Sequence, residues 1–151
     1  MAAALVTRLN FGKTDVIQML NGAIGGLVAI TAEPLMPSPI AAILIGAVGG
    51  IIVVYGTKFL LAMKIDDVVG AVPAHLFAGI WGTLAVPITN SGANFGTQLL
   101  GVIAINGTVF AISFIIWVLM KNTVGIRLSK EGEIKGTDVT ETGVIAYAIR
   151  D

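Results

Sequence analysis

The sequence predicts an all-α integral membrane protein: four transmembrane helices followed by a C-terminal tail. Of its 151 residues, 56% are hydrophobic and only 12% are charged, whereas soluble domains carry about a quarter charged residues. A chain this short cannot hide so much apolar surface from water in a single core. Glycine is also abundant, at 19 residues, as is usual in membrane helices. The composition therefore favours lipid as the solvent.

Four apolar windows approach the roughly 20 residues that a spanning helix needs. They run from about Val16 to Ala32, from Ile40 to Met63, from Val68 to Ile88 and from Phe95 to Met120. The first window is at the short end of the range, and the fourth is long enough to require tilt or a protruding end. Prolines at 37 and 39 separate the first two windows, and Asp66 and Asp67 are expected to cap the third helix.

These windows divide the chain into a transmembrane part, residues 1–123, and a polar tail, residues 124–151. The first residues, MAAALVTRL, resemble the last turns of a helix that begins upstream. We therefore expect a partial chain.

The basic residues predict the orientation. With four crossings, all nine lie on one side of the membrane, and the two opposite loops contain none; they are Arg8, Lys13, Lys58, Lys64, Lys121, Arg127, Lys130, Lys135 and Arg150. The positive-inside rule places that side, and with it the tail, in the cytoplasm. The prediction is a multi-pass protein of the cell membrane. Glu33 is then the only charged residue on the outer side.

Small residues recur four positions apart, at Gly22 and Gly26, Gly46 and Gly50, and Ala78 and Gly82. Such pairs let helix backbones approach closely in a membrane. We expect packing to explain most of these glycines, with a few leaving room for a pore. Trp81 and Trp117 are likewise expected to be packing or interfacial residues.

Several function classes are excluded or disfavoured. The chain has no cysteine and a single histidine, so no thiolate or multi-histidine metal site is expected. Nine basic and nine acidic residues balance, and nothing indicates binding to nucleic acid. No phosphate loop, nucleophile–base pair or nucleotide fingerprint is present. We therefore predict that the protein is not an enzyme and holds no cofactor.

His75 is the one ionisable residue well inside a predicted span. It follows Asp67 by eight residues, or about 12 Å of helix. In helical spacing it shares a face with Ala71, Gly79 and Gly82. A polar imidazole among small residues suits a narrow path, and intramembrane ionisable groups are functional candidates. The alternative is a histidine that is hydrogen-bonded inside the helix bundle as part of its packing.

Three stretches of the sequence resemble one known family. Residues 64–82, KIDDVVGAVPAHLFAGIWG, are similar to the stretch of the ammonium transporter family (Amt/Mep/Rh) that carries Asp-Asp, a pore histidine and Gly-Ile-Trp-Gly. Residues 21–31, NGAIGGLVAIT, resemble that family's eighth helix, and VGIRLS at 124–129 resembles the start of its tail. The tail resemblance continues in order through Glu131, Glu133, Gly136, Asp138, Gly143 and Tyr147. The resemblance covers essentially the whole chain.

The resemblance implies part of an eleven-helix transporter fold: the end of helix seven, helices eight to eleven, and a regulatory tail. It implies ammonium or ammonia as substrate, a homotrimer with one pore in each subunit, and a PII-type signalling protein as a partner at the cytoplasmic face. By the same resemblance, His75 is the second of two pore histidines, with Ala71 and Gly79 beside it in the substrate pathway. The first pore histidine and the outer binding site have no counterpart here. The chain is therefore expected to be inactive by itself.

The sequence departs from the family at Pro73, where relatives have a small residue, at Thr142, where they have histidine, and at Glu33-Pro34. Two other functions stay open. One is a non-transporting structural or regulatory membrane fragment. The other is a small four-helix exporter that works as a dimer, which usually needs a membrane-embedded carboxylate.

Overall fold

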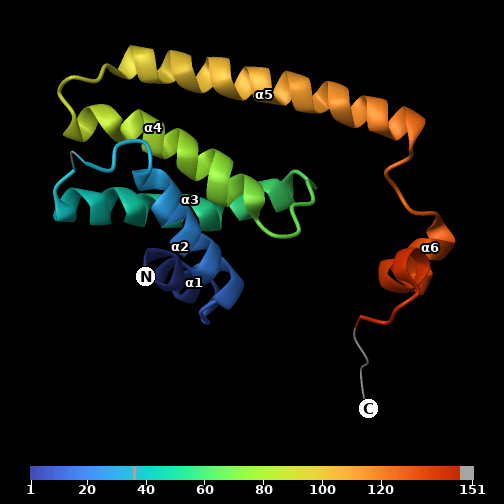
Figure 1. Ribbon diagram of the computed structural model, residues 1–151. Coiled ribbons are helices and arrows are strands. Elements are labelled where there is room, and N and C mark those ends of the chain that lie inside the picture. The colour runs from blue at the N-terminus through green and yellow to red at the C-terminus, as the bar shows by residue number, and fades with distance from the viewer. Residues whose placement is uncertain (36, 147–151) are drawn as a thin grey trace. The chain divides into compact units, whose positions relative to one another are not determined.

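The computed structural model describes residues 1–35 and 37–146, and every regular element in this part of the chain is a helix (Figure 1). The elements are α1 (Ala2–Phe11), α2 (Val16–Ile30), α3 (Pro39–Ala62), η1 (Val72–Phe77), α4 (Ala78–Thr89), α5 (Phe95–Thr123), α6 (Lys130–Lys135) and η2 (Asp138–Thr142). The two η elements are π-helical turns. The chain forms two compact units, Met1–Ile105 and Asn106–Asp151. The all-α prediction is confirmed.

Within residues 1–35 and 37–146, three helical stretches are long and apolar enough to cross a membrane: Pro39–Ala62, Val72–Thr89 and Phe95–Thr123. Their mean hydropathies are 2.3, 1.3 and 2.3. The first predicted span is shorter than expected, because α2 ends at Ile30 after 15 residues. At 1.5 Å per residue it is about 22 Å long, less than the roughly 30 Å of a bilayer's hydrocarbon. Crossing by α2 stays a prediction.

Local side-chain caps fix where α2 and α3 begin. The carboxylate of Asp15 accepts the Gln18 N–H at 3.0 Å, and the Ser38 hydroxyl accepts the Ala41 N–H at 3.3 Å. Pro39 occupies the first position of α3, where the missing N–H costs no helical bond. The predicted break between the first two spans is therefore confirmed.

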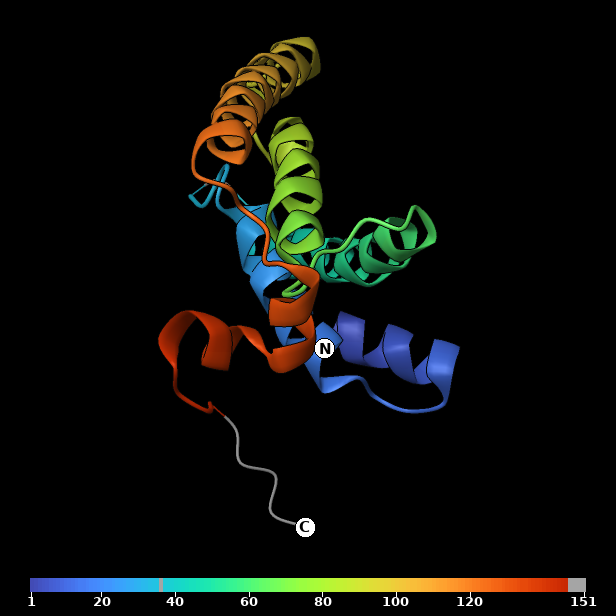
Figure 2. The same cartoon turned by 90° about the vertical axis from the view of Figure 1, so that its right-hand side faces the viewer.

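In the first unit, helices α2 and α3 pack against each other through glycines. Figure 2 shows the same helices turned by 90°. Gly22, Gly25 and Gly26 lie opposite Gly50, Gly49 and Gly46. A Cβ on Gly26 would lie 3.0 Å from the Gly46 carbonyl oxygen, and one on Gly49 would lie 2.7 Å from that of Gly25. Only glycine permits so close an approach. The packing prediction for these pairs is confirmed, and Ala78 and Gly82 are also buried.

The longest helix, α5, has no buried residue among its 29. It is about 44 Å long at 1.5 Å per residue, which exceeds the hydrocarbon thickness. The prediction of tilt or a protruding end for this span therefore stands. Trp117 on α5 is 56% exposed, and an interfacial place for it stays a prediction.

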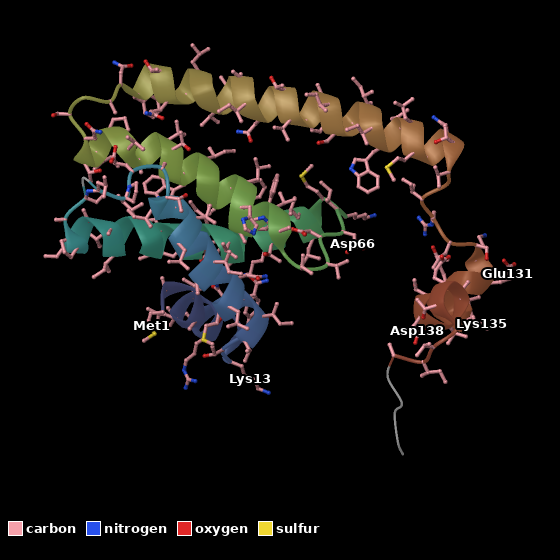
Figure 3. All side chains as sticks on the ribbon, viewed as in Figure 1. Met1, Lys13, Asp66, Glu131, Lys135 and Asp138 are labelled. Carbon is pink, nitrogen blue, oxygen red and sulfur yellow. The ribbon has the colours of Figure 1, made fainter. Side chains whose placement is uncertain are left out.

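Short-range contacts organise the tail. The Ser129 hydroxyl accepts the Gly132 N–H at 3.1 Å and caps α6. Arg127 forms a solvent-exposed salt bridge with Glu133 at 2.9 Å. The carboxylate of Asp138, labelled in Figure 3, accepts the Ala146 N–H at 2.8 Å. This N–H, with that of Val139, holds the pKa of Asp138 below its usual value. Tyr147 and Arg150 lie outside the described residues.

Candidate functional site

Asp67 fixes the start of the helix that carries His75. Its Oδ1 accepts the Ala71 N–H and its Oδ2 accepts the Val72 N–H, both at 2.9 Å. A carboxylate on the first free amides of a helix satisfies donors that have no helical partner. The capping prediction is confirmed for Asp67, while Asp66 is exposed in the loop before it.

The helix opens with a π-helical turn, Val72–Phe77, and becomes α-helical from Ala78 to Thr89. Pro73 lies at the start of this turn and has no N–H to donate. The chain forms a wide turn here, and this turn contains both Pro73 and His75. Single π turns inside helices are often found at functional sites.

The four residues that share the predicted face differ in their exposure. Ala71 and His75 are exposed, Gly79 is half-buried, and Gly82 is buried. A Cβ on Gly79 would lie 3.6 Å from a methyl group of Val28 in α2, whereas one on Gly82 would meet the main chain of Ala29. Along the face that α-helical spacing predicts for these four residues, exposure therefore decreases from His75, which is exposed, to Gly82, which is buried.

The opposite side of the π turn is packed tightly against α3. Pro73 and Ala74 are buried, and Gly56 of α3 makes room for this side of the turn. A Cβ on Gly56 would lie 2.6 Å from the Phe77 ring and 3.1 Å from the Pro73 Cβ. The Phe59 and Phe77 rings also lie 6.4 Å apart between centroids. One side of the turn is therefore packed against α3, whereas the imidazole of His75 is exposed.

Among residues 1–35 and 37–146, His75 has no hydrogen-bond partner for its imidazole. The same residues contain no cluster of three or more His, Cys, Asp or Glu side chains placed to hold a metal ion.

Trp81 has a packing role. Its indole N–H donates to the Ile45 carbonyl at 3.0 Å, which joins α4 to α3. Trp81 packs beside the buried cluster of Ala29, Ile45 and Ala85. This confirms the prediction for Trp81.

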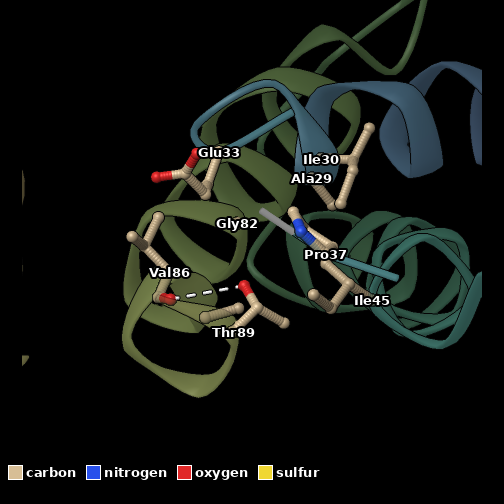
Figure 4. Close-up of a pocket in the computed structure, with 9 residues that line it drawn as sticks. Ala29, Ile30, Glu33, Pro37, Ile45, Gly82, Val86 and Thr89 are labelled. Atoms are coloured by element: carbon tan, nitrogen blue, oxygen red, sulfur yellow. Dashed lines mark hydrogen bonds between the residues drawn. The ribbon is translucent and has the colours of Figure 1, made fainter. Parts of the chain in front are cut away.

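At the other end of this unit, Glu33 is bound by a neighbouring loop. The Asn90 amide donates to Glu33 Oε2 at 2.8 Å, which joins the α2–α3 loop to the turn after α4. Glu33 borders a cavity of about 10 Å³ together with Gly82, Val86, Thr89 and others (Figure 4). This volume holds at most about one water molecule. One carboxylate oxygen of Glu33 therefore takes part in a hydrogen bond between two loops.

Two features were missed by reasoning from the sequence: the π turn and the tie between Glu33 and Asn90. Pro73 was the only local signal for the π turn, and a proline alone indicates a perturbed helix without specifying its form. The tie joins residues 57 apart in the chain, and no local pattern predicts it.

Comparison with known proteins identifies the family. The model of the Ammonium Transporter Family matches residues 1–147. Ammonium transporter Amt2 of Archaeoglobus fulgidus is 35% identical over 167 residues, which cover 97% of this chain and 36% of the relative. A putative ammonium transporter of Synechocystis is 40% identical over 136 residues, covering 89% of this chain and 31% of the relative.

A solved structure named Sensor Amt Protein matches with a TM-score of 0.85 and 29% identity, covering 93% of this chain and 38% of that one. The chain thus spans about a third of the length of the curated relatives it matches. These relatives are named as transporters, in agreement with the prediction of a membrane protein that is not an enzyme. The chain belongs to the ammonium transporter family.

Proposed function

We propose that this chain forms part of an ammonium pathway, in which His75 lines the path and Ala71 and Gly79 leave room beside it. The proposal rests on the exposure of the His75 imidazole. It is exposed on a π turn that is packed from behind, and it has no hydrogen-bond partner within the described residues. An intramembrane polar group in this position suits a transported molecule better than a packing role.

The physical chemistry favours passage of neutral ammonia. Moving an ammonium ion through a dry apolar path costs far more free energy than moving the neutral amine. A neutral imidazole has one donor and one acceptor nitrogen. It therefore suits hydrogen bonding to ammonia, and it offers a route for the proton that ammonium must release.

We also propose that the tail is cytoplasmic. The one-sided basic residues support this. The bond between Glu33 and Asn90 supports the narrower point that the two loops expected on the outer side lie on the same side. The boundary of the transmembrane part at residue 123 belongs to the same proposal. The resemblance extends it to a homotrimer and a PII-type partner, which crosslinking in membranes and binding of a purified PII protein would test.

The test replaces the matched third of the Archaeoglobus Amt2 transporter with these 151 residues. The chimera is expressed in cells that lack their own ammonium transport, and uptake is normalised to assembled protein. We expect His75→Leu to assemble normally and to transport poorly or with altered selectivity among monovalent cations. His75→Glu, which restores a polar proton carrier, is expected to retain part of the activity if the imidazole relays protons.

Thr83→Val is the matched control, since it removes a polar group from the same helix without touching the imidazole. A purely packing role predicts a loss of about 0.6–2 kcal/mol in stability and unchanged transport. If the His75→Leu chimera assembles and transports with unchanged rate and selectivity, the proposal is wrong. Uptake by vesicles that contain only these 151 residues would contradict the expected inactivity of the chain alone, and would favour the small exporter.

A further inference from the structure

Helices α1 and α3 of the first unit bring their C-terminal ends together. The nitrogen of Ala3 in α1 lies 3.8 Å from the place that a Cβ on Gly50 of α3 would take. Eight residues further along each helix, the Lys58 ammonium lies over the Phe11 ring. Because the offset is equal along both helices, α1 and α3 run side by side in the same direction. Phe11 is the last residue of α1, and Lys58 lies one turn before the end of α3 at Ala62.

Two aromatic rings fix the place of the Lys58 ammonium. It lies 4.4 Å from the centroid of the Phe11 ring and 5.4 Å from that of the Tyr55 ring, both within the roughly 6 Å of a cation–π contact. The Asn10 amide donates to the Tyr55 hydroxyl at 3.5 Å and joins the same two helices. Phe11 is 54% exposed and Tyr55 is 50% exposed, so this surface stays open to its surroundings.

The charge of Lys58 has no acidic partner. Within residues 1–35 and 37–105, no basic side chain forms a salt bridge; the basic residues there are Arg8, Lys13, Lys58 and Lys64. The carboxylates of Asp15 and Asp67 accept helix amides instead. Lys58 also makes no hydrogen bond within these residues, although an ammonium has three N–H donors. Its charge and its donors are therefore available to an anion.

We propose that the surface formed by Asn10, Phe11, Tyr55 and Lys58, the Lys58 patch, binds the phosphate of an anionic phospholipid. Lys58 lies about 6 Å of helix before the end of a membrane-spanning stretch, and a lysine at such a depth extends its ammonium towards the headgroups. The phosphate oxygens would accept from this ammonium and from the Tyr55 hydroxyl, which keeps its proton because it is the acceptor in its bond with Asn10.

The charges favour an anionic lipid over a zwitterionic one. A headgroup with a net negative charge matches the uncompensated charge of Lys58, whereas a zwitterionic headgroup brings a cation of its own. The position one turn inside the end of an apolar helix favours a lipid over a phosphate free in solution. The Lys58 patch does not depend on the transport role proposed for His75.

The test compares the affinities of the chain for phosphatidylglycerol and phosphatidylcholine with the same acyl chains. The chain is titrated with each lipid in a non-ionic detergent, and native mass spectrometry counts the lipids that it binds. We expect the first site to prefer phosphatidylglycerol, and Lys58→Gln to lower that preference roughly fivefold, as for one basic residue near a membrane surface. Lys58→Arg should retain the preference, because a guanidinium stacks on aromatic rings and binds phosphate.

Two further variants separate the Lys58 patch from a general attraction between basic residues and anionic lipids. Lys64→Gln is the matched control. It removes the same charge close to the end of α3, where the ammonium lies over no aromatic ring of the described residues, and it should change the preference little. Phe11→Leu keeps every charge but removes a ring that positions the ammonium. It should weaken the preference in the parent and have no effect in the Lys58→Gln chain.

Three results would overturn the assignment. The first is an equal loss in Lys58→Gln and Lys64→Gln, which would show attraction by surface charge alone. The second is an unchanged preference in Phe11→Leu. The third is no preference between the two lipids in the parent, together with binding of inorganic phosphate that Lys58→Gln abolishes, which would identify a site for free phosphate instead of a lipid.

Discussion

Replacement of Gly82 by alanine tests a close contact between α4 and the main chain of α2. Gly82 of α4 is buried against α2. A Cβ at this position would overlap the Ala29 carbonyl group, with the carbonyl carbon and the Cα of Ala29 each at 2.8 Å. The obstacle is main chain, so it cannot rotate away as a flexible side chain would. The helices must separate, or their backbones must shift.

The expected magnitude follows from two opposing terms. Overpacking a tight contact costs about 1–3 kcal/mol, and a main-chain obstacle places Gly82→Ala near the upper end. Alanine also gains about 1 kcal/mol over glycine in helix propensity. The net expectation is a loss of about 2 kcal/mol in the free energy of unfolding. Gly101 in α5, which has no atom within 4 Å of its ideal Cβ, is the matched control, and its replacement by alanine should gain up to about 1 kcal/mol.

The measurement is reversible unfolding of the chain in mixed detergent micelles. Fluorescence is read from Trp81 in a Trp117→Phe background, since the indole of Trp81 donates to α3 and reports on the loss of that contact. If Gly82→Ala is as stable as the parent, or if Gly101→Ala loses as much stability as Gly82→Ala, the assignment of Gly82 to a close helix contact is wrong.

Two further predictions concern topology and the tail. Because the chain has no cysteine, single cysteines can be labelled without background; an impermeant thiol reagent applied to intact cells should label positions Ser38 and Ser91, and should reach Lys64 and Ser129 only after lysis. The reverse pattern would refute the orientation. In the tail, the carboxylate of Asp138 accepts the Ala146 N–H, and this hydrogen bond lowers the pKa of Asp138. This contribution is present above the usual pKa of an aspartate and is lost as the pH falls through the lowered value. The Ala146 amide signal should therefore be constant from about pH 8 to about 5 and change only in stronger acid, whereas Asp138→Asn should show no such acid step; a change near neutral pH would contradict the contact.

The sequence predicts the helices well because their signals are local. Apolar length, prolines at 37 and 39, and the capping residue Ser38 mark the start of α3 within a residue or two. The contact between α2 and α3 is also predictable from the sequence, since small residues four positions apart lie on one helix face and allow close packing. For these elements, secondary structure and packing follow from the same few residues.

The geometry around His75 is less predictable. Counting by α-helical spacing groups His75 with Gly79 and Gly82, but the π turn alters that spacing and Gly82 is buried against Ala29. The loop just before the turn is bound from another helix, because the Asn21 amide, 48 positions earlier in the chain, donates to the Val69 carbonyl at 2.8 Å. A bond of that kind depends on how α2 packs, so it cannot be inferred from the residues next to Pro73.

One side of the helix that carries His75 is closely packed, and the other side exposes the imidazole. On the packed side, Gly56 and Gly82 admit neighbouring groups so closely that a single methyl group would collide, and Asp67 holds the first amides. On the open side, the imidazole has no partner within the described residues. The backbone that carries the imidazole needs firm support, although the rotamer of the side chain is fixed only by contacts of its own. The close packing behind the turn supplies that support, and it accounts for the concentration of glycine, proline and capping residues around a single histidine.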